Sequence, residues 1–217
     1  RRPFQGAAAA GPRGAAVLAE AARDVLSLHE LLPPTLFSLE LASVPQLAML
    51  YRNDCRHLAR RAMALGHAYS AALRPALGAH PVLLSAALAL ARAGDAAAEG
   101  QVRVQGRALM EILEDLRGLS PAASHEKGAA KAVEQVLDSL RRLGAVWRHV
   151  LPAAVHADVM GRGLLRPVAD LCSRMVLALP DVAEDDADAI CRVLTPLLDR
   201  APAAAAAGEA PGSGGGG

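Results

Sequence analysis

Residues 129–151 carry a wide apolar stripe with the period of an α-helix. At 100° per residue, its apolar positions fall within an arc of about 140°, and charged or amide side chains take the other side. The apolar positions are Val133, Val136, Leu137, Leu140, Leu143, Gly144, Trp147, Val150 and Leu151. A stripe of this width needs two neighbouring helices to cover it, so it predicts a bundle rather than a two-stranded coil. Trp147 lies within the stripe, and we predict that it is a core anchor between helices. The alternative is that it binds a partner protein.

The helical period recurs along the chain, and no stretch alternates β-branched residues as a strand does. We expect helices at roughly 15–32, 44–74, 81–117, 124–150, 154–179 and 185–200. Pro33 and Pro34 should end the first helix, because the proline ring removes an amide donor and clashes with the preceding turn. Gly161, Gly163 and Pro167 interrupt the fifth, where we expect a kink or a restart. The predicted fold class is all-α, an antiparallel multi-helix bundle.

The two ends of the chain are low in complexity. Residues 1–14 hold an alanine run with glycines and prolines, and residues 201–217 pass from alanines into a glycine tract. Both offer little apolar surface to bury, so we expect them to be disordered on either side of one bundle at 15–200. The sequence opens without an initiator Met, and we expect it to be a piece of a longer protein.

Composition argues against several classes of function. Aromatic residues make up 2% of the chain, whereas proteins that read single-stranded nucleic acid stack bases on aromatic side chains. The formal net charge is +1, so no global field attracts nucleic acid or anionic lipid. The longest apolar run, residues 81–91, is too short to span a bilayer. We therefore expect no direct nucleic-acid partner.

No spacing of residues indicates catalysis, a metal site or a cofactor. Cys55, Cys172 and Cys191 are far apart with no CxxC, so we expect free buried thiols in a reducing compartment. The seven histidines form no HExxH or HxH pair, and the glycines form no phosphate-binding loop. The acidic run from Asp181 to Asp188 lacks the DDxxD spacing of all-α terpene synthases and fits a helix N-terminus. We therefore predict no catalytic, metal-binding or cofactor-binding residues.

Residues 44–74 carry the one candidate for partner binding. Arg52, Arg56 and Arg60 form an i, i+4 row on the polar face of this segment. This basic ridge is either an ordinary solvated face or a docking surface for an acidic partner. Asp54 and Arg61 fall on the apolar face instead, where they either set helix register through polar contacts or lie at its edge.

Three stretches resemble one known family. They are Val44–Leu50 with Asn53–Cys55 and Ala64–His67; Lys131–Leu137 with the LGxVWxxVLP sequence at 143–152; and Met160–Gly161 with the acidic helix start Glu184–Asp188. Together they resemble the C-terminal part of the zeste-white-ten family of centromere/kinetochore proteins. The resemblance runs with gaps from about residue 17 to 200, and the sequence around Trp147 is its most specific part.

The resemblance implies a non-enzymatic scaffold with the elongated helical rod of the CATCHR tethering subunits. It implies two assemblies: a tether at the endoplasmic reticulum that captures Golgi-derived retrograde vesicles with SNAREs, and the Rod–Zwilch complex at kinetochores that recruits dynein–dynactin and supports the spindle checkpoint. The C-terminal region would dock on an α-solenoid, NAG or Rod. Localisation would be cytoplasmic, at the reticulum periphery in interphase and at kinetochore and spindle in mitosis, with membrane association only through partners.

Three other interpretations stay open on the residues alone. The chain could be an unrelated soluble helical-bundle interaction module, or an all-α enzyme whose site residues are dispersed. It could also bind a lipid surface, although its polar faces mix Asp and Glu with Arg, unlike the basic faces of membrane-lying helices.

Overall fold

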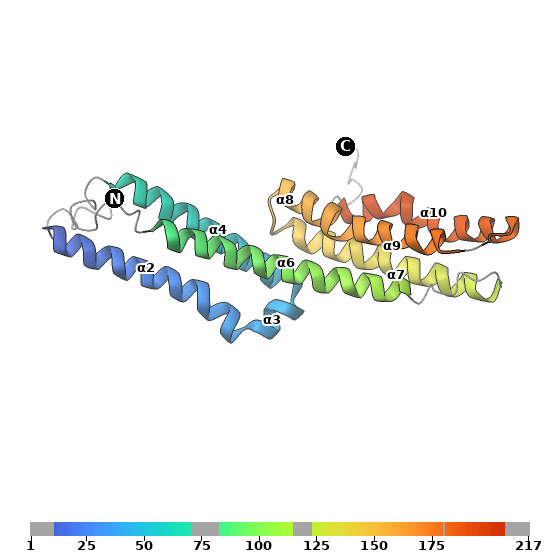
Figure 1. Ribbon diagram of the computed structural model, residues 1–217, viewed down its shortest axis with the longest axis horizontal. Coiled ribbons are helices and arrows are strands. Elements are labelled where there is room, and N and C mark those ends of the chain that lie inside the picture. The colour runs from blue at the N-terminus through green and yellow to red at the C-terminus, as the bar shows by residue number, and fades with distance from the viewer. Residues whose placement is uncertain (1–10, 71–82, 115–122, 180, 207–217) are drawn as a thin grey trace, which may run out of the picture. The chain divides into compact units, whose positions relative to one another are not determined.

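The computed structural model of this chain is all-α (Figure 1), and it describes residues 11–70, 83–114, 123–179 and 181–206. No strand occurs within those ranges, as the sequence predicts. The helices are α2 (Gly11–Leu36), α3 (Ser38–Ser43), α4 (Pro45–Ala68), α6 (Leu84–Glu114), α7 (Ala123–Arg148), α8 (Ala153–Asp158), the π-helix η2 (Val159–Leu165), α9 (Arg166–Leu177) and α10 (Glu184–Ala206). The expected helix ends at 71–74, 81–82 and 115–117 lie outside the described residues, as do residues 1–10 and 207–217 of the expected tails.

The chain divides into two compact units, Arg1–Glu99 and Gly100–Gly217. Residues 15–200, which we expect to form one bundle, are therefore divided between these two units. The boundary falls inside α6, which is long enough for its two halves to serve different units.

Small side chains bring α4 and α6 close together in the first unit. The buried cluster here is Leu41, Ala48, Tyr51, Cys55, Ala59, Ala62, Leu83, Ala87 and Leu90. At Gly94 of α6, a Cβ atom would lie 2.8 Å from the Cβ of Cys55 and 3.1 Å from the Cα of Arg52. Only glycine fits at that distance, so the two helix backbones meet almost directly.

The prediction that Pro33 and Pro34 end the first helix is wrong, because α2 continues through both to Leu36. The two rings remove the amides that would donate to the carbonyls of His29 and Glu30. The hydroxyl of Tyr51, on α4, lies 2.9 Å from the Glu30 carbonyl oxygen and 3.4 Å from that of His29. It donates to the nearer oxygen and replaces a hydrogen bond that the helix itself cannot make.

Replacing Tyr51 by Phe should therefore lower the free energy of unfolding by about 1–2 kcal/mol, because a carbonyl beside the core loses its donor. Urea unfolding followed by circular dichroism measures this loss. The change Pro34→Ala restores the amide that donates to Glu30, so Tyr51→Phe should cost less in that background. An equal cost in both backgrounds would show that the hydroxyl does not act as the missing donor.

The second unit is built from the rest of α6, α7, the continuous run α8–η2–α9, and α10. Its fully buried large side chains include Leu109, Leu113, Val133, Val136, Leu137, Leu140, Trp147 and Leu164. Where we expect a kink or a restart at Gly161, Gly163 and Pro167, the structure has the π-helix η2, and α9 follows it without a break, with Pro167 in its first turn. A Cβ at Gly163 would lie 2.7 Å from the Cγ1 of Val102, so the glycine lets this irregular turn approach α6.

Helical structure extends beyond the predicted ends of the bundle on both sides. Helix α2 begins at Gly11, and α10 extends past residue 200 to Ala206. Ala201, Ala204 and Ala205 are buried. Alanine is the best helix former, and its small side chain allows close packing, so this alanine run belongs to the folded unit.

Candidate interaction surfaces

Two of the three arginines in the basic ridge have a carboxylate partner on α6. The Nε atoms of Arg52 and Arg56 lie 3.0 and 3.1 Å from the same oxygen of Asp95, and a second nitrogen of Arg56 binds its other oxygen. Arg60 donates to the carbonyl of Arg56 at 3.3 Å. Because Gly94 brings α4 and α6 together next to Asp95, the ridge is partly neutralised within the chain. The role of the ridge in partner binding stays a prediction.

Asp54 and Arg61 are both exposed. Their exposure supports a position at the edge of the apolar face rather than polar contacts that set helix register. At the edge, a charged side chain keeps its hydration and needs no buried partner.

The described residues hold no group of three His, Cys, Asp or Glu side chains that could bind a metal ion. Cys55 and Cys172 are buried as expected, and burial raises the pKa of each thiol. Cys191 is exposed, so the expectation of a buried thiol is wrong there. None of the described helices combines the length and hydropathy that crossing a membrane requires.

Trp147 is fully buried, in the unit where α7 packs along α10. At Gly144, one turn earlier, a Cβ would lie 2.5 Å from the carbonyl oxygen of Ala205. The carbonyl of Gly144 accepts a hydrogen bond from Nε2 of the buried His156 at 3.0 Å. The Arg148 guanidinium donates to the carbonyl of Ala206, where a cation suits the C-terminus of a helix. The end of α10 is therefore fixed against α7.

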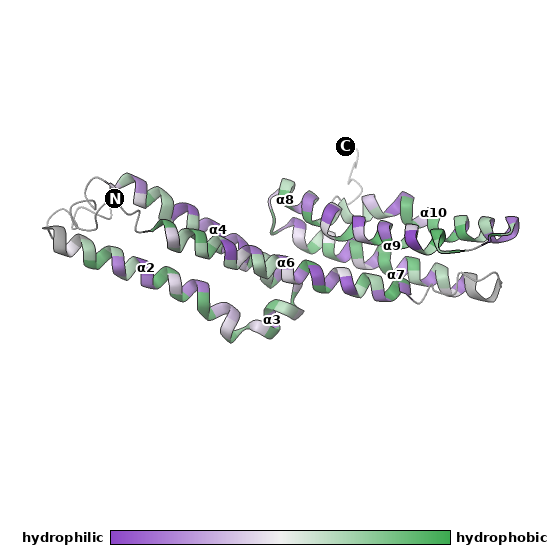
Figure 2. Ribbon diagram, in the orientation of Figure 1, coloured by the Kyte–Doolittle hydropathy of each residue, from purple (hydrophilic) through white to green (hydrophobic). Residues whose placement is uncertain are grey.

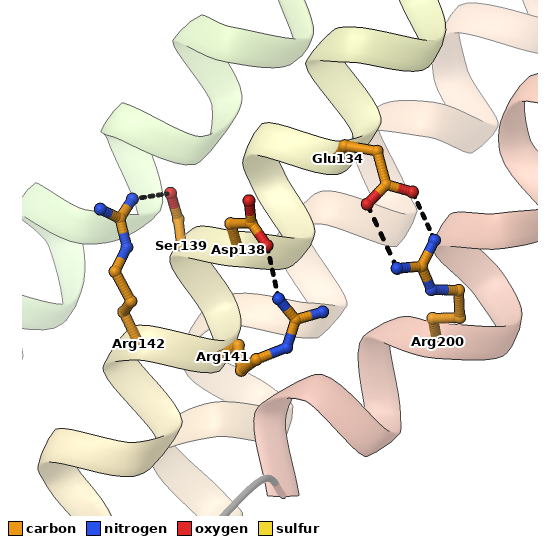
Figure 3. Close-up of polar contacts among 6 residues, drawn as sticks. All are labelled: Glu134, Asp138, Ser139, Arg141, Arg142 and Arg200. Carbon is orange, nitrogen blue, oxygen red and sulfur yellow. Dashed lines mark hydrogen bonds and ion pairs between the residues drawn. The ribbon is translucent and has the colours of Figure 1, made fainter.

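Of the polar contacts drawn in Figure 3, one joins α7 to α10 and the others lie within α7. Arg200 of α10 binds both carboxylate oxygens of Glu134, one of them at 3.2 Å. Arg141 pairs with Asp138 within α7. These side chains are about half exposed, so each pair contributes about 1 kcal/mol or less.

An open apolar groove lies between α9 and α10. Its volume is about 490 Å³. From α9 and the end of η2 it is lined by Leu165, Val168 and Leu177, and from α10 by Leu194 and Leu198, among other residues. Leu177 is 83% exposed and Leu198 is 63% exposed. Large apolar side chains this exposed on both walls of one groove are typical of a binding surface.

A second apolar surface runs along α2 in the first unit. Hydrophobic residues recur along this helix (Figure 2). Those that are exposed include Val17, Val25, Leu28, Leu32 and Leu36. Successive residues of this set are eight, three, four and four positions apart, which is close to whole helical turns, so they lie on one side of the helix.

Two regions of the chain match two domains that are defined for one protein family. "Centromere/kinetochore protein zw10, C-terminal" matches residues 2–111, and "ZW10 C-terminal helical domain" matches residues 131–208. The centromere/kinetochore protein zw10 homolog of Mus musculus is 31% identical over 183 residues, which is 83% of this chain. The chain belongs to the zw10 family. The family resemblance that its helix-surface residues indicate is thereby confirmed.

Two further zw10 homologs give the same result. That of Rattus norvegicus is also 31% identical over 83% of the chain, and that of Arabidopsis thaliana is 25% identical over 76%. The chain spans 23% of the length of the mouse and rat relatives and 22% of the plant relative.

The two zw10 matches correspond broadly to the two compact units. The first match covers α2 to α4, with the basic ridge, and most of α6. The second begins within α7 and includes Trp147 and the groove between α9 and α10. The two apolar surfaces therefore belong to different matched regions of the family.

Proposed function

We propose that this chain is a non-enzymatic docking module of a multisubunit complex that works at kinetochores. The observation that carries the proposal is its similarity to zw10 homologs named as centromere/kinetochore proteins, over 83% of the chain. Two exposed apolar surfaces, on α2 and between α9 and α10, support a role in protein binding.

In the finer form of the proposal, the chain docks on an α-solenoid subunit. In mitosis this subunit is Rod, within the Rod–Zwilch complex that recruits dynein–dynactin and supports the spindle checkpoint. In interphase it is NAG, within the tether at the endoplasmic reticulum that captures retrograde vesicles together with SNAREs. The resemblance described above supports this assignment, and the chain reaches membranes only through these partners.

Affinity capture tests the proposal directly. The 217-residue chain, immobilised and checked for helicity by circular dichroism, is incubated with mitotic or interphase lysate, and bound proteins are identified by mass spectrometry. We expect Rod from mitotic cells and NAG from interphase cells. Recovery of neither on a folded chain would contradict the docking role.

The basic ridge gives a kinetic prediction within this proposal. Arg60→Glu should slow association with a purified Rod solenoid fragment and weaken its dependence on salt, because a rim charge acts mainly on the association rate. Asp95→Asn is the matched control, since it frees Arg52 and Arg56 from their carboxylate and should speed association. Stopped-flow fluorescence at several salt concentrations measures both rates. Equal association rates for the parent chain and both variants would mean that the ridge does not take part in the interface.

A further inference from the structure

The groove between α9 and α10 has the shape of a seat for one helix. Its α9 wall extends from Leu165 to Leu177, about 18 Å at the helical rise of 1.5 Å per residue. That length accommodates three turns of an inserted helix. Val168, Val176 and Leu197 also line the groove, so an inserted side chain would meet mainly apolar surface, with the hydroxyl of Ser173 as the polar exception among the lining side chains.

The occupant must be convex. Two copies of this chain that met groove to groove would leave a void between the two hollows, and its walls would lose their van der Waals contacts. A single amphipathic helix presents a ridge of side chains at i, i+3, i+4 and i+7, which fits between two helices.

The charges beside the groove also differ between its two walls. On α9, Arg166, Asp170 and Arg174 form an exposed i, i+4, i+8 row next to the lining residues. On α10, Asp188 and Asp199 are exposed in the corresponding row, together with Arg192, which already has an interaction within the chain. The α9 wall is therefore net positive and the α10 wall net negative.

We propose that this groove binds an amphipathic helix of a protein partner. The helix presents large aliphatic residues to the groove, acidic residues along the edge beside α9, and basic residues along the edge beside α10. The inference rests on the proposed function in one respect: the helix belongs to the solenoid partner.

A designed peptide tests the groove without that assumption. The probe is a fluorescent peptide of about 18 residues with Leu at i, i+3, i+4 and i+7 positions, Glu along one edge and Lys along the other. Its binding to the 217-residue chain is measured by fluorescence anisotropy. We expect Leu177→Glu and Leu198→Glu each to weaken binding about tenfold or more, since each replaces an exposed apolar contact on one wall of the groove by a charge.

Three controls distinguish specific binding in the groove from nonspecific hydrophobic binding of the peptide. Leu39→Glu alters an equally exposed leucine on α3 (79% exposed) and should leave peptide affinity unchanged. A peptide of the same composition with scrambled leucines should not bind. Peptides with two acidic or two basic edges should bind more weakly than the mixed peptide. Equal binding of the scrambled peptide, or unchanged affinity in Leu177→Glu and Leu198→Glu, would overturn the proposal.

The same variants distinguish this proposal from the function itself. If a Rod solenoid fragment binds the chain and both leucine variants bind it equally well, the groove assignment fails and the docking function stands. If the peptide binds in the groove while neither Rod nor NAG binds the folded chain, the groove stands as a helix-binding site and the docking function fails.

Discussion

Replacing Trp147 by Ala should destabilise the second unit by about 3–5 kcal/mol. The side chain is fully buried, and it is the largest of the fully buried residues. Its loss removes apolar area and leaves a cavity that surrounding helices fill only in part. This is a large share of the 5–15 kcal/mol that typically stabilises a domain. Urea unfolding followed by circular dichroism measures the change, because the variant has no tryptophan left to report by fluorescence.

Val146→Ala provides the matched control for Trp147→Ala. Val146 is the preceding residue on the same helix, but it is 38% exposed, so its truncation should cost well under half as much. A Trp147→Ala protein that stayed as stable as the parent and lost only its partner would mean that Trp147 is a binding residue rather than a core anchor.

Gly144→Leu should destabilise the same unit by about 3 kcal/mol, at the upper end of the range for overpacked cores. The new Cβ alone would lie 2.5 Å from the carbonyl oxygen of Ala205 and 3.2 Å from that of Ala204. Both are backbone atoms, so α10 must move away from α7 as a whole. Gly144→Ala should cost less, because it adds only the Cβ atom, and its gain in helix propensity over glycine offsets part of that clash.

Gly128→Ala is the control for the effect of Gly144. Gly128 is on the same helix, and a Cβ there would meet no atom within 4 Å. The substitution should raise stability by about 0.5–1 kcal/mol, because alanine loses less backbone entropy in a helix. Thermal unfolding of the two alanine variants should therefore shift in opposite directions. Equal shifts would mean that α7 and α10 do not meet at Gly144.

The helical class and the burial of Trp147 can be predicted from the sequence, because the period of the α7 stripe is a local property. The continuation of α2 through Pro33 and Pro34 cannot be predicted in this way. Pro33 and Pro34 are strong local signals for a helix end, and the hydroxyl that compensates them comes from Tyr51, which the local pattern does not connect to them. The position of Asp95 between two ridge arginines was hidden for the same reason, since 43 residues separate it from Arg52.

The alanine run near the C-terminus illustrates a second limit. Low complexity suggested a tail, whereas small size is what α7 requires of its neighbour at Gly144. The groove between α9 and α10 depends on the spacing of two helices, which periodicity within one helix does not reveal. Its leucines could be assigned to an apolar face, but not to an uncovered one.

The close backbone contacts at Gly94 and Gly144, together with the many buried alanines, imply an uneven tolerance to mutation. Alanine loses no side-chain entropy on folding, but it also removes little apolar area from water. Stability must then come mainly from a few large residues such as Trp147, Leu137 and Leu140. A saturation mutagenesis screen for folded protein should give two separate groups of positions. At one group almost any change is tolerated, and at the other either enlargement or truncation removes most of the folded population.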